Sequence, residues 1–194
     1  GRCIQKPYDQ GVDAYREDYL NRYNNGELMH KDSIKMPDSL KFETLLLKRE
    51  VYGGGGIMPD IFVPLDTSEI SPLYRKISRK GIINTFTFSY VDQNRESLKA
   101  TYANFDDFKK KFTVEGKVMD EFWALAKTKE IEFVEEEYAT SKKLINTLLK
   151  ARIAANLFES SKFYPIYNEM ENEIFMKGLE LIEGKTISDL GLDY

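Results

Sequence analysis

The spacing of apolar residues changes near residue 66. From Thr67 onward, apolar side chains recur every three or four positions, which places them on one face of an α-helix. This pattern predicts helices over residues 73–77, 105–108, 118–126, 135–158 and 161–182. Residues 82–90 are rich in β-branched and aromatic residues that fit either a helix or a strand, and the helical surroundings favour a helix there. Several amphipathic helices joined by short loops favour a bundle-like helical domain over residues 67–194.

Polar and small residues predict where some of these helices begin and end. Thr67 and Ser68, followed by Pro72, predict the amino-terminal cap of the first helix. Asn104 is expected to cap the helix at residues 105–108, and Gly184 is a candidate carboxyl-terminal cap for the last helix.

Residues 1–66 are rich in turn-forming residues instead. They contain the glycine run at positions 53–56 and four prolines, at positions 7, 37, 59 and 64. Strands are predicted at residues 1–5 and 44–52, with a further extended piece at 61–63. A helix is predicted at residues 12–23, within an insert of about residues 9–40. The expected fold class is therefore α+β: a small β element with an inserted helix, followed by a mostly α-helical bundle-like domain.

Composition narrows the class of protein. Of the 194 residues, 42% are hydrophobic and 31% are charged, a balance that supports a folded core. The net charge of −4 provides no positive field for phosphates, so we expect no nucleic-acid partner. One cysteine and one histidine exclude an intramolecular disulfide and a multi-histidine metal cage. The chain opens on a strand-like sequence, so we expect it to be part of a longer protein.

The glycine run at residues 53–56 is the most conspicuous motif. A phosphate-binding loop would need a lysine, a hydroxyl residue and a helix after its glycines, whereas Ile57-Met58-Pro59-Asp60 follows here. The run therefore predicts a tight turn or a close backbone approach between strands, with at least one glycine at positive φ.

Other candidate catalytic groups have ordinary structural explanations. His30 lies in a polar stretch typical of a surface histidine, and Cys3 is expected to be buried in a strand. The acidic groups Glu135–Glu137 and Glu169, Glu171 and Glu173 are typical of solvated faces. No pair of serine and lysine residues is singled out by the sequence. We therefore predict no catalytic, cofactor-binding or metal-binding residue in this chain.

Two segments resemble a known family. The sequence Gly1-Arg2-Cys3-Ile4-Gln5, and later the sequence from Val51 through the four glycines and Pro59-Asp60 to Pro64, are similar to the end of the catalytic domain in C-terminal processing peptidases, or tail-specific proteases. Residues 138–143 and 149–157 resemble the helical extension of envelope members. The insert separates two segments that many members of the family join closely.

The resemblance implies two domains with different roles. Residues 1–66 would close a peptidase catalytic domain and residues 67–194 would form a helical carboxyl-terminal domain. The family cleaves proteins near their carboxyl termini with a Ser–Lys dyad that precedes this region, as does its peptide-binding PDZ module. No catalytic residue is carried over, Gln5 included, and this chain is expected to be inactive alone.

Two other readings stay open. Residues 67–194 could be a helical protein-interaction or dimerisation module with no catalytic activity, and the chain could form a homo-oligomer. An unrelated enzyme would have only His30 and scattered carboxylates to work with. By resemblance, the expected partners are the upstream catalytic and PDZ regions and protein or peptide substrates. The expected location is the periplasm or cell envelope.

Overall fold

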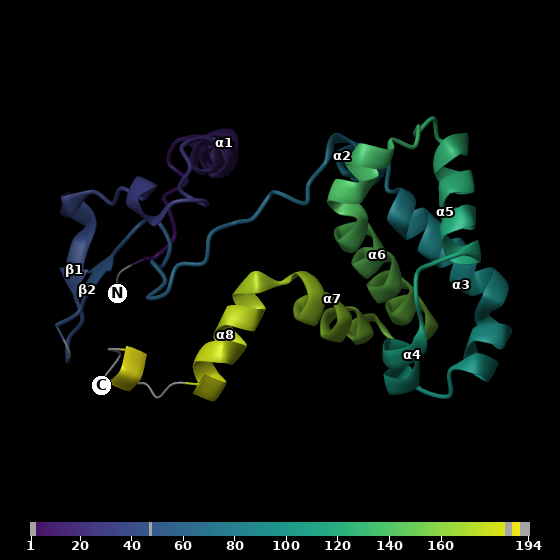
Figure 1. Cartoon of the computed structure of the whole chain (residues 1–194). Helices are drawn as coiled ribbons and strands as arrows, with labels where there is room; N and C mark the ends of the chain where they lie inside the picture. Colours follow the sequence, from purple (N-terminus) through teal and green to yellow (C-terminus); the bar gives the residue numbers. More distant parts are fainter. Residues whose placement is uncertain (1–2, 47, 185–187, 191–194) are drawn as a thin grey trace. The chain divides into compact units, whose positions relative to one another are not determined.

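The computed structural model describes residues 3–46, 48–184 and 188–190. Its contacts divide the chain into two compact units, and the boundary in the first part of the chain lies between Asp66 and Thr67. The unit that contains the described residues up to Asp66 holds one helix and a two-stranded sheet, and the unit Thr67–Gly184 is helical (Figure 1). The fold class is α+β, as the sequence predicts.

The first unit is built around a short hairpin. Strands β1 (Lys41–Glu43) and β2 (Glu50–Tyr52) are antiparallel, with Phe42 opposite Val51. The predicted strand at 44–52 is therefore wrong at residues 44–46, 48 and 49, because Thr44 and Arg49 close the hairpin turn, and residue 47 lies outside the described residues. The Thr44 amide donates to the Arg49 carbonyl at 2.9 Å, and the Arg49 amide donates to Thr44 Oγ1 at 3.0 Å.

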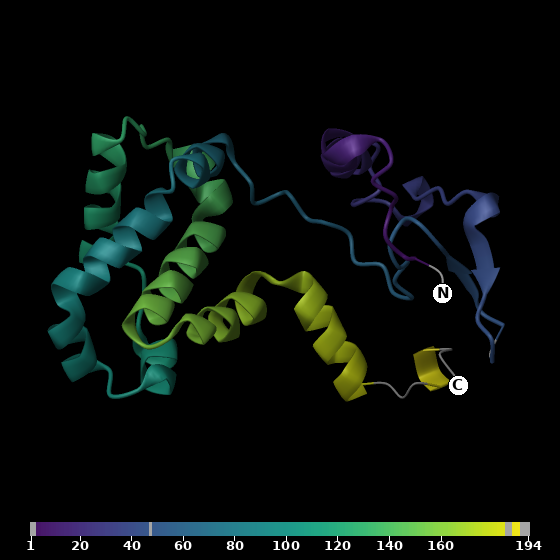
Figure 2. The same cartoon turned by 180° about the vertical axis from the view of Figure 1, so that it is seen from behind.

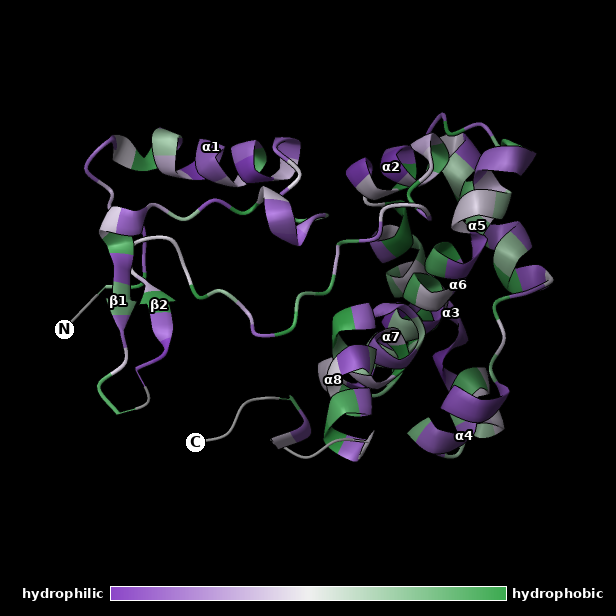
Figure 3. Ribbon diagram, turned by 60° about the vertical axis from the view of Figure 1, so that its left-hand side comes forward, coloured by the Kyte–Doolittle hydropathy of each residue, from purple (hydrophilic) through white to green (hydrophobic). Residues whose placement is uncertain are grey.

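The predicted inserted helix is present as α1 (Gly11–Asn24). It has no buried residue, and most of its residues are hydrophilic (Figure 3). Two short 3₁₀ helices follow it, η1 (Lys31–Ser33) and η2 (Asp38–Leu40).

Two further predictions for the first unit are wrong. The predicted strand at 1–5 is absent over residues 3–5, and residues 1–2 lie outside the described part of the chain. The extended piece at 61–63 is not part of a strand. Cys3 is exposed rather than buried. Cys3 and Ile4 each accept a single backbone hydrogen bond, from Gly54 and Gly56, which is too few to form a strand ladder. A β-prone composition alone therefore does not make a strand there.

The second unit contains seven α-helices within its described residues. They are α2 (Pro72–Arg79), α3 (Ile82–Thr101), α4 (Phe105–Lys111), α5 (Lys117–Thr128), α6 (Glu135–Leu157), α7 (Tyr164–Glu171) and α8 (Glu173–Gly184), with a 3₁₀ turn η3 (Ser160–Phe163) before α7. The 3₁₀ turn η4 (Ser188–Leu190) lies outside this unit and is grouped with the first one. The pattern at residues 82–90 is the start of a helix that continues to Thr101.

Local caps explain where α2 and α4 begin. Asn104 Oδ1 accepts a hydrogen bond from the Asp107 amide at 2.9 Å, which confirms the predicted cap of α4. The cap of α2 is Ser71, not Thr67 or Ser68, and its Oγ accepts from the Tyr74 amide at 3.1 Å. Pro72 occupies the first helical position, so the residue directly before it takes the capping role.

Helix α6 is the centre of the hydrophobic core. It packs along α3 and also contacts α2, α4 and α7 (Figures 1 and 2). Its buried apolar residues include Ile145, Leu149, Ile153 and Leu157, and they share a core with Phe122 of α5. This confirms the predicted core face of the helix, although Leu148 is only partly buried.

The predicted helix at 161–182 is interrupted at Asn172. That residue has φ −98° and ψ 87°, and its Oδ1 accepts from the Phe175 amide at 3.0 Å, which caps α8. The apolar spacing also predicts that Ile174 packs in the helical core, and this is wrong because Ile174 is 69% exposed. An asparagine that caps its own downstream turn competes with helix continuation.

Among the described helices, none combines the length and the apolar character that a bilayer span requires.

Candidate functional site

The glycine run brings two distant segments of the sequence together. The Gly54 amide donates to the Cys3 carbonyl at 3.0 Å, and the Gly56 amide donates to the Ile4 carbonyl at 2.7 Å. Gly54 and Gly56 have φ of 72° and 96°, which confirms the predicted positive φ. The run follows β2 rather than joining the strands, so the close backbone approach, not the hairpin turn, is its role.

Packing restricts this approach further. A Cβ atom on Gly53 would lie 3.2 Å from the Phe42 ring and 3.7 Å from the Cys3 carbonyl oxygen. The Gly53 amide donates to the Leu40 carbonyl at 2.9 Å, next to β1. The insert thus loops away and returns, so that the two segments that carry the family resemblance lie side by side.

The residues considered as isolated catalytic candidates do not converge. Cys3 and His30 are both exposed, and His30 directly precedes η1. Within the described ranges, no group of three or more histidine, cysteine, aspartate or glutamate side chains could hold a metal ion.

The acidic groups separate into different roles. Glu135–Glu137 form the first turn of α6, where negative charge favours the amino-terminal end of the helix dipole. Glu169 pairs with Lys109 at 2.5 Å. The Glu171 side chain is only 6% exposed, so the predicted solvated face is wrong for this residue, and its carboxylate accepts from Thr147 Oγ1 at 3.0 Å.

Glu171 also takes part in a small charge cluster that the sequence did not indicate. Lys143 Nζ lies 3.5 Å from Glu171 Oε1 and 3.6 Å from Glu69 Oε1. Burial, followed by the Glu69 carboxyl group, raises the pKa of Glu171, although the Thr147 hydroxyl and Lys143 oppose this. The cluster joins α6, α7 and the segment before α2.

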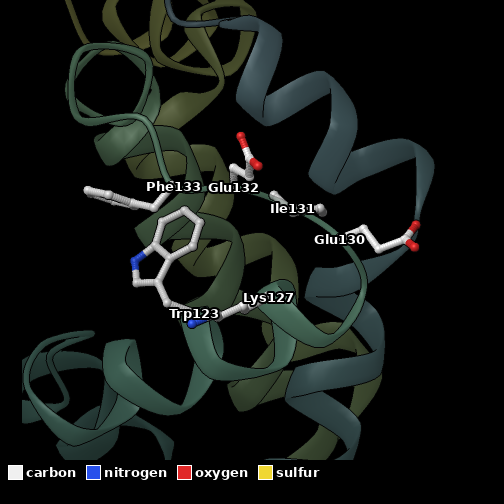
Figure 4. A pocket seen from close by; sticks show the side chains of 6 residues that line it. All are labelled: Trp123, Lys127, Glu130, Ile131, Glu132 and Phe133. Carbon is white, nitrogen blue, oxygen red and sulfur yellow. The ribbon is translucent and has the colours of Figure 1, made fainter.

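A groove lies in the helical unit between the end of α5 and the loop that leads into α6. It has a volume of about 480 Å³ and is lined by Trp123, Lys127, Glu130, Ile131, Glu132 and Phe133 (Figure 4).

Aromatic rings form one wall of this groove. The Trp123 indole meets the Phe133 ring edge-on, with centroids 4.8 Å apart, and meets the Tyr138 ring at 5.2 Å. Phe133 remains 47% exposed despite these contacts. Burial is the main reason that the pKa of Tyr138 is raised, and the nearby Glu135 adds to it.

A helix-ending motif shapes the floor of the groove. The Ile131 amide donates to the Ala126 carbonyl at 3.1 Å and the Glu130 amide to the Lys127 carbonyl at 3.0 Å, the two bonds of a Schellman motif. Glu130 occupies the left-handed position of this motif with φ 58°, where glycine is usual. Ile131 is buried, and the chain after it turns outward at Phe133.

The charged rim of the groove is only partly neutralised. The Glu130 side chain is 92% exposed, and its nearest ammonium group belongs to Lys80, at 3.7 Å. Lys80 Nζ also donates to the Lys129 carbonyl at 2.5 Å, which fixes it at the end of α5. From 130 to 137 the sequence has five glutamates and no basic residue.

Sequence reasoning missed this groove. The left-handed residue is glutamate rather than glycine, so the usual composition signal of a helix end was absent. The exposed Phe133 and Val134, which fall between two helical patterns, were the signal that could have indicated it.

Part of the helical unit matches a known family model. Residues 73–159, which run from α2 to just past the end of α6 and include the groove, match the model of a family of unknown function, DUF8443. Neither the curated proteins nor the solved structures contain a match to the chain.

Proposed function

We propose that this chain is the carboxyl-terminal part of a serine-type endopeptidase, a hydrolase that processes proteins near their carboxyl termini. The observation that carries the proposal is the pairing of Gly54 and Gly56 with the carbonyls of Cys3 and Ile4. The two segments with the family resemblance act as one structural element, despite the insert between them.

The lack of a core in the first unit also supports the proposal. Among the described residues up to Asp66, only Gly53 is buried. Leu45, Leu46 and Ile57 are 87%, 92% and 77% exposed. A unit of this size needs a hydrophobic core for stability, and the remainder of a catalytic domain would supply one.

No residue of this chain is assigned to the chemistry. The catalytic serine and lysine and the PDZ module would belong to a preceding segment, and the periplasmic or envelope location rests on the family resemblance. In that arrangement residues 3–66 complete the catalytic domain, and the helical unit is an appended domain. Protein or peptide substrates would be cleaved by the joined segments.

Proteolysis assays test this proposal. We expect the chain alone to leave unfolded protein substrates and carboxyl-terminal peptides intact from pH 5 to 9, because the nucleophile and base are missing. Joined to the segment encoded upstream, it should cleave them, and replacing the upstream serine by alanine should abolish cleavage. Cleavage by the repurified chain alone would contradict the proposal.

A second candidate function is a helical protein-interaction module without catalytic activity. The exposed aromatic groove favours it, because a solvent-facing Phe133 beside Trp123 is a typical contact surface for a partner. An inactive joined protein that still binds other proteins through the helical unit would support this alternative over the peptidase.

A further inference from the structure

The groove combines an apolar wall with a partly unpaired acidic rim. Trp123 and Phe133 offer ring faces and edges at one side, and Ile131 closes the floor (Figure 4). A ligand therefore needs a large apolar group to cover the rings. Aromatic and aliphatic side chains satisfy this requirement, because offset or edge contacts with rings add to the gain from area burial.

The charges of the lining select among apolar ligands. Glu130 and Glu132 contribute two carboxylates and Lys127 contributes one ammonium group. Lys80 is near Glu130 only, at 3.7 Å, and no ion pair of Glu132 is found among the described side chains. Residues 130–137 contain five glutamates and no basic residue, so this segment is locally acidic and a cation beside the apolar group is favoured.

We propose that this groove binds an extended peptide segment in which a large apolar side chain is adjacent to lysine or arginine. The apolar side chain covers Trp123 and Phe133, and the basic side chain reaches Glu132. This inference goes beyond the peptidase assignment, and its test involves no cleavage, so either can fail while the other stands.

The backbone at Glu130 supports a binding role. A non-glycine residue at φ 58° costs free energy, and here Glu130 takes that position in the helix-ending motif while its side chain stays 92% exposed. Burial of Ile131 alone does not require a glutamate at this position. A carboxylate kept at the rim of an aromatic groove is what recognition of a basic segment requires.

The single tryptophan makes the test direct. Trp123 is the only tryptophan of the chain, so its fluorescence reports on the groove without interference. The probes are three capped tetrapeptides, Gly-Phe-Arg-Gly, Gly-Phe-Glu-Gly and Gly-Ala-Arg-Gly, titrated into the full chain. We expect saturable quenching or a wavelength shift with the first peptide, at a Kd on the order of 0.1–1 mM.

Charge reversal distinguishes binding that depends on Glu132 from non-specific hydrophobic binding. Glu132→Lys should weaken the Phe-Arg peptide by about threefold to fivefold, as expected for an exposed ion pair, and should make the Phe-Glu peptide the better ligand. Glu96→Lys makes the same charge change on an exposed position of α3 outside the groove and should leave the preference unchanged. Phe133→Ala should weaken both Phe-containing peptides, and circular dichroism would verify that each variant is folded.

Two results would overturn the proposal that the groove binds such a peptide. Equal binding of the Phe-Arg and Phe-Glu peptides, or an unchanged preference in Glu132→Lys, would overturn the charge argument. Failure of the Phe-Arg peptide to saturate at 10 mM, with the wild-type chain folded, would overturn the groove as a peptide site.

Discussion

The two units of this chain solve the problem of stability in different ways. All 22 buried apolar residues of the described chain lie between Leu73 and Ile166, in the helical unit. The first unit instead relies on backbone hydrogen bonds, namely those of a hairpin with two three-residue strands and those of the glycine run. A unit held mainly by backbone bonds is fixed in conformation only when something else covers its apolar side chains. The contrast identifies the helical unit as the independent folding element.

The largest expected effect comes from making the same substitution, leucine to alanine, once in each unit and comparing the loss of stability. Leu149 is fully buried in α6 and Leu46 is 92% exposed in the hairpin turn. Leu149→Ala should lower the free energy of unfolding by roughly 2–5 kcal/mol, because it removes buried contacts and leaves a cavity. Leu46→Ala should change it by no more than about 0.5 kcal/mol. Denaturant unfolding followed by circular dichroism measures both.

Equal effects of the two substitutions would contradict the division into a cored and a coreless unit. A large effect of Leu46→Ala alone would place a hydrophobic core in the first unit that the structure does not contain.

The helical core was the part of the fold that sequence could predict well. Periodicity located α5 and α6 because each has a buried face repeated over several turns, and Asn104 was correctly identified as a cap. Helix α3 was predicted only over residues 82–90, and from its helical surroundings rather than from its own spacing. Errors arose where one residue overrides the pattern. Asn172 ends α7 through its own side-chain hydrogen bond, and this depends on a backbone geometry that composition does not specify.

The first unit was harder to predict for a physical reason. Its apolar residues have no local core to face, so alternation gave no reliable strand boundary between Thr44 and Tyr52. The glycine run was interpretable because positive φ strongly favours glycine, and Gly54 and Gly56 have it. The groove was not predictable, since it depends on Glu130 occupying a position that glycine usually takes.

The glycine run gives a second, smaller test of the same contrast. Gly56→Ala places a side chain at φ 96° with no neighbour within 4 Å, so its cost is backbone strain alone, about 1–2 kcal/mol. Hydrogen exchange should then become roughly tenfold faster in residues 3–66 and stay unchanged in the helical unit.

Gly178→Ala is the matched control for that substitution. Gly178 lies inside α8, also with nothing within 4 Å of an added Cβ, but without positive φ. Alanine there should stabilise the helix by about 0.5–1 kcal/mol. If both substitutions slow exchange, the glycine run is not conformationally restricted and its role in joining the two segments is wrong.

The smallest expected effect is a pH dependence confined to the helical unit. Burial and the Glu69 carboxyl group raise the pKa of Glu171, so the folded state holds this proton to a higher pH than the unfolded state does. The folded state then binds more protons in the interval between the ordinary and the raised pKa, and stability falls as the pH rises through that interval. Glu171→Gln keeps an acceptor for Thr147 but removes the titration. Unfolding free energies measured from about pH 4 to pH 7 should therefore decline less in this variant than in the wild type.

Thr147→Val should change the same slope in the opposite direction. The Thr147 hydroxyl donates to the Glu171 carboxylate at 3.0 Å and favours its ionised form, so losing it raises the pKa of Glu171 further and steepens the decline. Lys143 stays near both carboxyl groups in each variant, at 3.5 Å from Glu171 and 3.6 Å from Glu69, and its attraction limits the size of either change. Parallel pH profiles for the wild type and both variants would mean that Glu171 titrates alike in the folded and unfolded states. The effects of burial and of Glu69, which raise this pKa, would then be cancelled by those of Thr147 and Lys143, which lower it.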